Sequence, residues 1–298
     1  MRSQRRHADL RDPGIVVQLL LESAVGMLHS VQARAIVVAA DALPEGTPVP
    51  EDTIVVVRRE GDERLAEGLG VPPERRLEVP SVELDRLGQI KLAALIAASR
   101  RMLDLKDRAI FLSGPFGGLI DTMVVMHLGS ECELIRAADQ PGIDEHVKRA
   151  VFQRVLDLAL HLGAYGREGR SIGALMVVGD TSEVQERSEQ MILNPFQGYE
   201  AKKRNVMDPL MTETIREYSQ LDGAILIRGS GVIESAGTRI LAASKHPLEA
   251  GLGARHAAAA GITGATKAIA LTVSSTDGTV RVWRAGRMVA SLEPGPRD

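Results

Sequence analysis

Hydrophobic and polar residues alternate in blocks along the first 130 residues of the chain. Apolar side chains that recur every three to four positions predict helices over 15–30, 62–70 and 84–103. Short apolar, β-branched runs predict strands within 33–42, 51–61 and 107–114, and 75–80 is a candidate for a further strand. Because helices and strands alternate with short connections, this half is expected to form an α/β domain with a largely parallel sheet.

The pattern changes at a polar stretch that contains Pro141 and Gly142, which predicts a linker near 136–145. We therefore expect two domains, 1–138 and 139–298. In the second domain helices come first, and strands dominate from residue 222 onward. The elements expected there are helices over 147–169, 181–192 (capped by Thr181 or Ser182) and 212–221, a strand over 171–180, two strands within 223–237, and a meander over 267–290 that turns at Asp277–Gly278.

Composition and charge narrow the class of protein. Hydrophobic residues make up 44% of the 298 and charged residues 25%, as in globular domains, and the net charge of -3 argues against a general nucleic-acid binder. No apolar stretch reaches the roughly 18 to 20 residues that a membrane span needs. Because Cys132 is the single cysteine, no internal disulfide can form, and we expect it to be a buried structural thiol. We expect a cytoplasmic protein.

Two glycine-containing motifs in the second half carry candidate chemistry. Asp222-Gly223-Ala224 opens a predicted strand, and "GLGARHAAAA" at 251–260 is expected to open a helix. Glycine lets a ligand approach the backbone, and a helix N-terminus favours anions. Arg255 adds a planar donor fork suited to phosphate, His256 a donor that is partly cationic near neutral pH, and Asp222 a group that can hold a divalent metal. Taken singly, each motif is more typical of a turn or a solvated helix face.

Together the two motifs resemble those of the diadenylate cyclase family, which carries a D-G-A motif and a G-T-R-H-R motif at about this separation. The resemblance extends over about 150–290, through "GREGRSIGALMVVGD", "QMILNPFQGY" and "DGAILIRGSGVIESAGTRI", and is greatest to the archaeal type. It implies an α/β fold with a central mixed sheet flanked by helices. It also implies a nucleotidyltransferase that condenses two ATP molecules into cyclic di-AMP with Mn²⁺ or Mg²⁺, in at least a dimer of facing domains.

The resemblance also implies roles for individual residues. Asp222 would hold the metal and the attacking 3′-hydroxyl, and Arg255 and His256 would hold phosphates. The implied nucleotide-binding positions are Gly223, Ala224, Leu241 (packed on adenine), Gly253 and Ser274 (contacting phosphate). Three positions depart from the family pattern, because the motif threonine is Ala254, the second motif arginine is Ala257, and an acidic position is Ser275.

The first half resembles the C-terminal α/β domain of pyruvate kinase, through "ARAIVVAAD", "DTIVVVRRE", "DRAIFLSGPFG" and "DTMVVMHLG". A scaffold or oligomerisation role is favoured there over an effector pocket. For the second half, the alternative to an enzyme is a non-catalytic nucleotide-binding regulator, which Ala257 and Ser275 favour and Asp222 disfavours. A DNA sensor is not expected, because no helix-hairpin-helix signature follows residue 290 and the net charge is acidic.

Overall fold

The computed structural model of the protein describes residues 13–58, 60–104, 106–131, 146–166, 172–244 and 252–294. The chain divides into two compact units, one of residues 1–81 and 85–131 and the other of 82–84 and 132–298. The predicted boundary between residues 138 and 139 lies outside the described residues, as does Cys132. Both therefore stay predictions.

The N-terminal unit is a five-stranded sheet with helices on its faces. The strands lie in the order β3-β2-β1-β4-β5. β1, β2, β3 and β4 are parallel, whereas β5 runs antiparallel to β4 at the edge. The elements are α1 (Pro13–Leu28), β1 (Ala33–Ala39), η1 (Ala40–Ala42), β2 (Thr53–Val57), α2 (Glu60–Gly68), η2 (Pro73–Arg75), β3 (Arg76–Glu78), α3 (Arg86–Ser99), β4 (Arg108–Ser113), β5 (Thr122–His127) and α4 (Leu128–Glu131).

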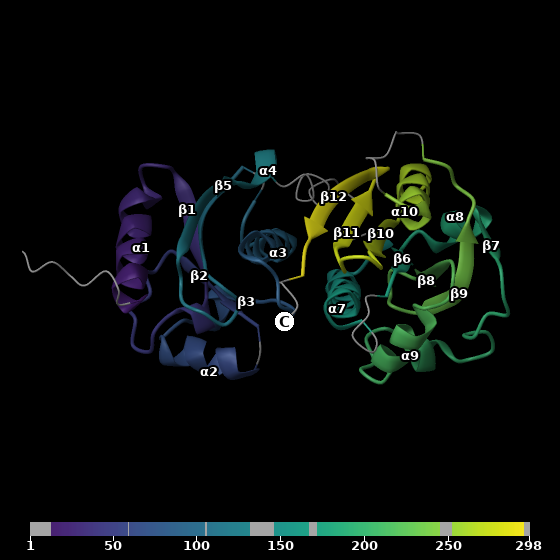
Figure 1. Cartoon of the computed structure of the whole chain (residues 1–298), viewed down its shortest axis with the longest axis horizontal. Coiled ribbons are helices and arrows are strands. Elements are labelled where there is room, and N and C mark those ends of the chain that lie inside the picture. Colours follow the sequence, from purple (N-terminus) through teal and green to yellow (C-terminus); the bar gives the residue numbers. More distant parts are fainter. Residues whose placement is uncertain are drawn as a thin grey trace, which may run out of the picture. The chain divides into compact units, whose positions relative to one another are not determined.

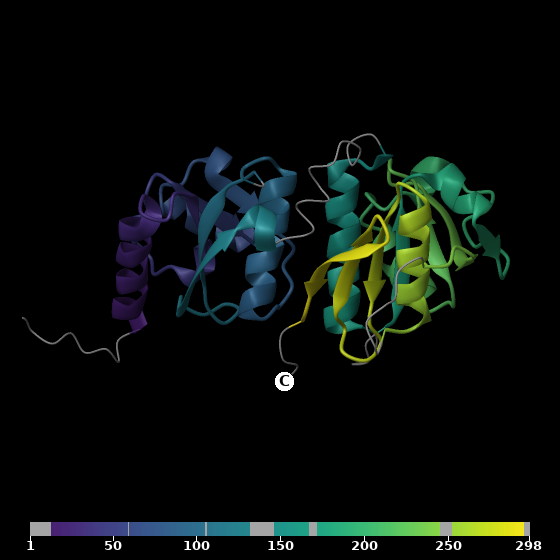
Figure 2. The same cartoon turned by 90° about the horizontal axis from the view of Figure 1, so that it is seen from above.

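Burial explains why the central strands are continuous apolar runs. Every residue of β2 is buried, as are the last five residues of β1 and of β4. α1 contacts β1 and β4, α3 contacts β3 and β4, and the two helices cover opposite faces of the sheet (Figures 1 and 2). A strand covered on both faces has no solvent side and needs no alternating polar positions. The expected α/β class and largely parallel sheet are confirmed.

The C-terminal unit is built around a seven-stranded mixed sheet. The strand order is β12-β11-β10-β6-β8-β9-β7, in which β6 and β8 are parallel and the other neighbours antiparallel. The elements are α7 (Arg149–Tyr165), β6 (Ala174–Val178), α8 (Thr181–Glu186), β7 (Ser188–Gln190), η3 (Ala201–Arg204), α9 (Met211–Tyr218), β8 (Ala224–Ile227), β9 (Ile233–Ile240), α10 (Ala254–Ala265), β10 (Ile269–Val273), β11 (Val280–Arg284) and β12 (Arg287–Leu292). The expected central mixed sheet is confirmed.

Helices α7 and α10 lie on opposite faces of this sheet (Figure 1). Apolar residues of β6, β10 and β11 form one buried cluster with residues of α10. The strands contribute Leu175, Val177, Ala270 and Trp283, and the helix contributes Ala259, Ala260 and Ile262. Alternate residues of a strand point to opposite faces, so the other half of each strand is free to face α7. The small side chains of α10 allow the helix to approach the sheet closely.

One predicted element is wrong. The pattern over 181–192 predicts a single helix, but α8 ends at Glu186 and β7 follows at once. The backbone carbonyl of Arg187 accepts a hydrogen bond from the N–H of Leu241, 2.8 Å away, and the next residues pair with β9. Pairing with a distant strand therefore overrides the local helical pattern.

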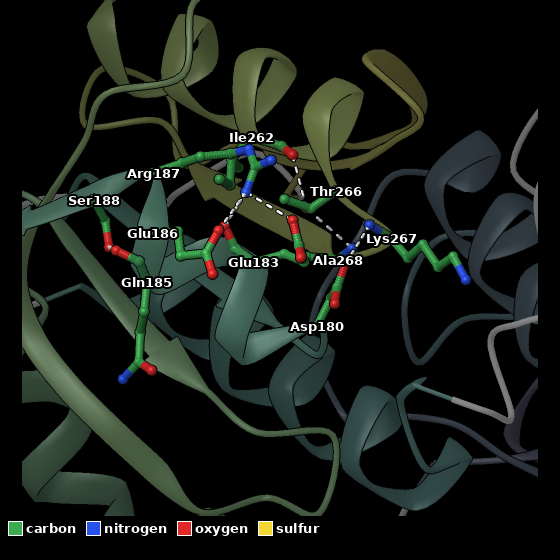
Figure 3. A network of polar contacts seen from close by, with 10 residues as sticks. All are labelled: Asp180, Glu183, Gln185, Glu186, Arg187, Ser188, Ile262, Thr266, Lys267 and Ala268. Atoms are coloured by element: carbon green, nitrogen blue, oxygen red, sulfur yellow. Dashed lines mark hydrogen bonds and ion pairs between the residues drawn. The ribbon is translucent and has the colours of Figure 1, made fainter.

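The start of α8 also differs from the prediction. The residue before the helix is Asp180, with φ 44° and no capping hydrogen bond from its side chain, so neither Thr181 nor Ser182 is the cap. Instead the Asp180 carboxylate accepts a hydrogen bond from the backbone N–H of Lys267 at 2.7 Å (Figure 3). This contact ties the start of α8 to the segment that leads into β10.

Candidate functional site

The Asp222–Ala224 motif forms a sharp turn at the start of β8. Gly223 has φ +95°, and a Cβ there would lie 2.8 Å from both the backbone N and O of Thr238. The N–H of Gly223 donates to Asp222 Oδ1 at 3.0 Å, Asp222 is exposed, and Ala224 is fully buried. Glycine is therefore required both by the backbone angle and by the neighbouring strand, and the turn presents a carboxylate at the edge of the sheet.

A polar network from β9 and β7 supports this turn, with Ser235 and Thr238 buried and Gln190 exposed. The hydroxyls of Ser235 and Thr238 are 2.7 Å apart, and Thr238 Oγ1 donates to Gln190 Oε1 at 3.1 Å. Gln190 Nε2 in turn donates to the carbonyl of Ala236 at 2.7 Å. These residues were not among those predicted from the sequence, because the network depends on β7, which the sequence pattern did not reveal.

Leu241 follows the last residue of β9 and lies at the same edge of the sheet as Asp222. The antiparallel pairing of Ala224 with Thr238 places the end of β9 beside the start of β8. Leu241 is 57% exposed although it is a large apolar residue. An exposed leucine at this edge can contact the face of a planar apolar ring. That it packs on adenine stays a prediction.

Helix α10 begins at the same edge with an open first turn. Gly253 precedes the helix, is exposed, and provides no side-chain cap. Arg255 in the first turn is partly buried, and its Nε is buried without a hydrogen-bond partner. Among the described residues the Arg255 guanidinium has no ion-pair partner either. A cation held beside an uncapped helix start, with no carboxylate to neutralise it, favours binding of an anion.

His256 points the other way, into the core. Its ring lies 5.9 Å from that of Trp283, centroid to centroid, and both ring nitrogens are buried without partners. Burial lowers the pKa of His256, and the positive charges of Arg281 and Arg255 lower it further, against an opposing effect of Asp277. The ring is therefore neutral at pH 7, unlike the partly cationic donor expected from the sequence. Its contact with phosphate stays a prediction.

Ser274, at the end of β10, has a hydroxyl that is used by a turn. Its Oγ accepts hydrogen bonds from the N–H groups of Thr276 at 3.3 Å and Asp277 at 3.4 Å. Burial raises the pKa of Asp277, but hydrogen bonds from Ser274 and Thr279 and the charge of Arg281 outweigh it, so the net pKa is lowered. Asp277 is thus an exposed, ionised turn residue, and the phosphate contact of Ser274 stays a prediction.

Topology brings these positions to one edge of the sheet. β10, β6, β8 and β9 are consecutive neighbours. Ala174 at the start of β6 pairs with Val273 at the end of β10, as Ala224 pairs with Thr238 between β8 and β9. The starts of the two parallel strands and the ends of their antiparallel neighbours therefore meet at the same edge. A carboxylate, an unpaired guanidinium and an exposed leucine suit a ligand with anionic and apolar parts.

The donor set limits how a metal can be held. Within the described part of the chain, no three His, Cys, Asp or Glu side chains gather in a way that could hold an ion. Asp222 is a single carboxylate, and its Oδ1 already accepts the Gly223 N–H. Mg²⁺ is commonly bound by one or two carboxylates together with substrate phosphates, so Asp222 fits an ion shared with a phosphate ligand.

None of the described helices has the length and apolar character that crossing a bilayer requires.

Comparisons with known proteins agree on one family. The family model described as "DAC: DisA bacterial checkpoint controller nucleotide-binding" matches residues 161–288, which contain every site residue above. The diadenylate cyclase of Haloferax volcanii is 31% identical over 226 residues, 75% of this chain and 82% of that protein. The diadenylate cyclase of Methanocaldococcus jannaschii is 38% identical over 178 residues, 59% of this chain and 56% of that protein.

The matched region is thus little more than half the length of the Methanocaldococcus jannaschii protein. Among solved structures, DacA from Staphylococcus aureus is 23% identical and is covered over 85% of its chain and 47% of this one, with a TM-score of 0.35. Structural similarity at that level adds nothing to the assignment, which depends on the sequence relatives and the family model.

Proposed function

The chain belongs to the diadenylate cyclase family, and on that basis we propose that it condenses two ATP molecules into cyclic di-AMP and releases two pyrophosphates. The observation that carries the proposal is the state of Arg255. Its Nε is buried without a partner, and its guanidinium has no carboxylate beside it among the described residues. An unpaired guanidinium at the edge where Asp222 and the open start of α10 meet suits a triphosphate.

The proposed reaction consists of two identical displacements. The 3′-hydroxyl oxygen of each ATP attacks the α-phosphorus of the other, a new P–O bond forms, and the bond from that phosphorus to pyrophosphate breaks. The hydroxyl proton leaves as the nucleophile attacks, and Asp222 is the acceptor at this edge of the sheet. No covalent enzyme intermediate is required, so the protein contributes mainly positioning and charge neutralisation.

Each residue of the site would have its own role in binding the nucleotide or the metal ion. Arg255 would hold phosphate oxygens through its guanidinium, and the turn at Gly223 and Ala224 would keep the backbone close to the nucleotide. Leu241 would pack on adenine, and Gly253 would leave the first N–H groups of α10 open. Asp222 would hold Mn²⁺ or Mg²⁺ jointly with the phosphates, and a bound divalent ion neutralises charge on the transferring group.

The proposal requires self-association. The chain carries one such domain, and each of the two displacements needs a second nucleotide facing the first, so the active species is at least a dimer. ATP is the small-molecule partner, and neither DNA nor a membrane is part of the reaction. A single cysteine and the use of ATP suit a cytoplasmic protein.

The test is incubation of the purified protein with ATP and Mn²⁺ or Mg²⁺, followed by chromatographic separation of the products. The wild type is expected to form cyclic di-AMP, Asp222→Asn to form none while still binding ATP, and the exposed control Asp52→Asn to match the wild type. Binding of ATP by the wild type without product in either metal would instead identify a non-catalytic nucleotide-binding regulator. Full activity of Asp222→Asn would remove Asp222 from the mechanism.

A further inference from the structure

Gly173 immediately precedes β6 and is buried, yet its backbone does not require glycine. The glycines of this chain with positive φ include Gly179, Gly223 and Gly237, but not Gly173. An alanine at position 173 could therefore adopt the same backbone angles without strain. The reason for a glycine must be sought in the space around it.

That space is occupied by Arg255. A Cβ on Gly173 would lie 2.7 Å from Nη1 and 3.3 Å from Cζ of Arg255, and 3.0 Å from Cβ of Ser275. The first turn of α10 and the turn after β10 thus meet over the bare backbone of Gly173. The guanidinium lies where the side chain of any other residue would begin.

We propose that Gly173 is a positioning residue for the nucleotide site, because its missing side chain forms the seat of the Arg255 guanidinium. This inference rests on the proposed cyclase function. The seat consists of backbone and a serine Cβ. No carboxylate from the described part of the chain pairs with Arg255 there, so the seat fixes the cation without neutralising it. Arg255 Nε is buried without a partner, and Nη1 is the guanidinium atom nearest the Gly173 backbone. No described residue accepts a hydrogen bond from the terminal nitrogens, so the guanidinium keeps donors for a phosphate.

The geometry predicts that Gly173→Ala weakens the binding of ATP without lowering the stability of the fold. The closest atom, Nη1, is at the far end of a flexible side chain, so the guanidinium can move away at little cost in stability. Ser275 Cβ, at 3.0 Å on an exposed turn, needs to shift by only about a few tenths of an ångström. Alanine also restricts the unfolded chain, which favours the folded state. The unfolding midpoint should therefore stay the same or rise slightly. The affinity for ATP should fall by about tenfold, as expected for the loss of one charge-assisted hydrogen bond.

Gly163 provides the contrast. A Cβ there would lie 2.2 Å from the backbone carbonyl oxygen of Gly278, which cannot swing away. Gly163→Ala should lower the unfolding midpoint, whereas Gly173→Ala should not. Gly61, in α2, has open space around its Cβ position and is the control for a glycine-to-alanine change without a steric conflict. Gly61→Ala should leave the affinity for ATP unchanged and, as in any helix, keep or raise the unfolding midpoint.

The decisive experiment is a double-mutant cycle between positions 173 and 255. The Kd for ATP, with KM and kcat for cyclic di-AMP formation, is measured for the wild type, Gly173→Ala, Arg255→Met and the double variant. If Gly173 acts through Arg255, Gly173→Ala weakens ATP binding in the wild type and has no further effect once Arg255 is methionine. Equal weakening in both backgrounds, or none in the wild type, would overturn the inference.

The outcomes separate this inference from the proposed function. A wild type that forms cyclic di-AMP, together with a Gly173→Ala variant of unchanged Kd and KM, removes the seat and leaves the cyclase intact. A wild type that binds ATP without product removes the cyclase, while the cycle in Kd still decides the role of Gly173. A wild type that neither binds nor converts ATP removes both.

Discussion

Replacing Arg255 by methionine should separate the stability of the fold from its affinity for nucleotide. Methionine retains an unbranched apolar stem and a similar helix propensity, but removes the guanidinium. Arg255 Nε is buried without a hydrogen bond, and the guanidinium has no ion-pair partner among the described residues. The fold therefore bears the cost of burying this donor without a compensating contact.

The expected magnitude follows from that cost. A buried donor without a partner costs about 1 to 3 kcal/mol, and the lower end applies because only part of the guanidinium is buried. Arg255→Met should therefore leave the free energy of unfolding unchanged or raise it by about 1 kcal/mol. The affinity for ATP should fall by about tenfold to a hundredfold, since one or two charge-assisted hydrogen bonds are lost.

Thermal or urea unfolding with and without ATP measures both effects in one assay. At an ATP concentration of about 100 times the wild-type Kd, the wild type should gain about 2.7 kcal/mol and Arg255→Met only about 0.4 to 1.4 kcal/mol. The exposed Arg34→Met is the matched control and should show the full wild-type gain. If Arg255→Met is destabilised by more than about 1 kcal/mol without ATP, the guanidinium has a structural role and the reasoning fails.

Three further predictions test other parts of the site. Gly223→Ala should lower the free energy of unfolding by about 1 to 3 kcal/mol in urea titrations, because φ is +95° and Thr238 blocks a Cβ; Gly198→Ala, with φ +86° and open space, should cost less. Burial lowers the pKa of His256 below its ordinary 6.5, so the neutral ring stabilises the fold fully above pH 6.5, and this stabilisation is lost as the pH falls below that value. The free energy of unfolding, measured from pH 8 to 5, should therefore decline less for His256→Gln than for the wild type. An equal decline would contradict the buried neutral ring. Leu241→Ala should change the free energy of unfolding by less than about 0.5 kcal/mol, because the side chain is 57% exposed, but raise KM for ATP; an unchanged KM would exclude an adenine contact.

Local sequence patterns predicted the elements whose structure is decided locally. The meander from β10 to β12 follows from apolar runs around an Asp277–Gly278 turn, and Gly278 does adopt a positive φ of 75°. The sharp turn at Gly223 follows in the same way. β7 was missed because its pairing with β9 joins residues about fifty positions apart, which no local pattern contains. The resemblance of the first unit to the pyruvate kinase C-terminal domain stays a prediction.

The burial of His256 could have been predicted from helix periodicity. Successive residues on an α-helix point about 100° apart, so Arg255 and His256 cannot both face the same ligand directly. His256 is three and four positions before Ala259 and Ala260, which are buried against the sheet, and it shares their face. The contact between Gly173 and Arg255, in contrast, could not have been predicted. It depends on β6, α10 and the turn after β10 meeting in space, and a glycine in a sequence does not indicate which atom lies where its side chain would be.

Arg255 and His256, neighbours in the first turn of α10, therefore face opposite ways, one toward the site and the other into the core. His256 fixes the rotation of the helix by packing against Trp283, whose Nε1 donates to Thr272 Oγ1 at 2.9 Å within the sheet. With that face anchored, the next residue back along the helix is turned toward the edge where Gly173 and Ser275 receive its guanidinium. Burial and the positive charges of Arg281 and Arg255 lower the pKa of His256 and keep its ring neutral, although the carboxylate of Asp277 opposes them. The positive charge offered to a phosphate at this end of α10 thus comes from Arg255, whereas the neutral ring of His256 packs against Trp283 in the core.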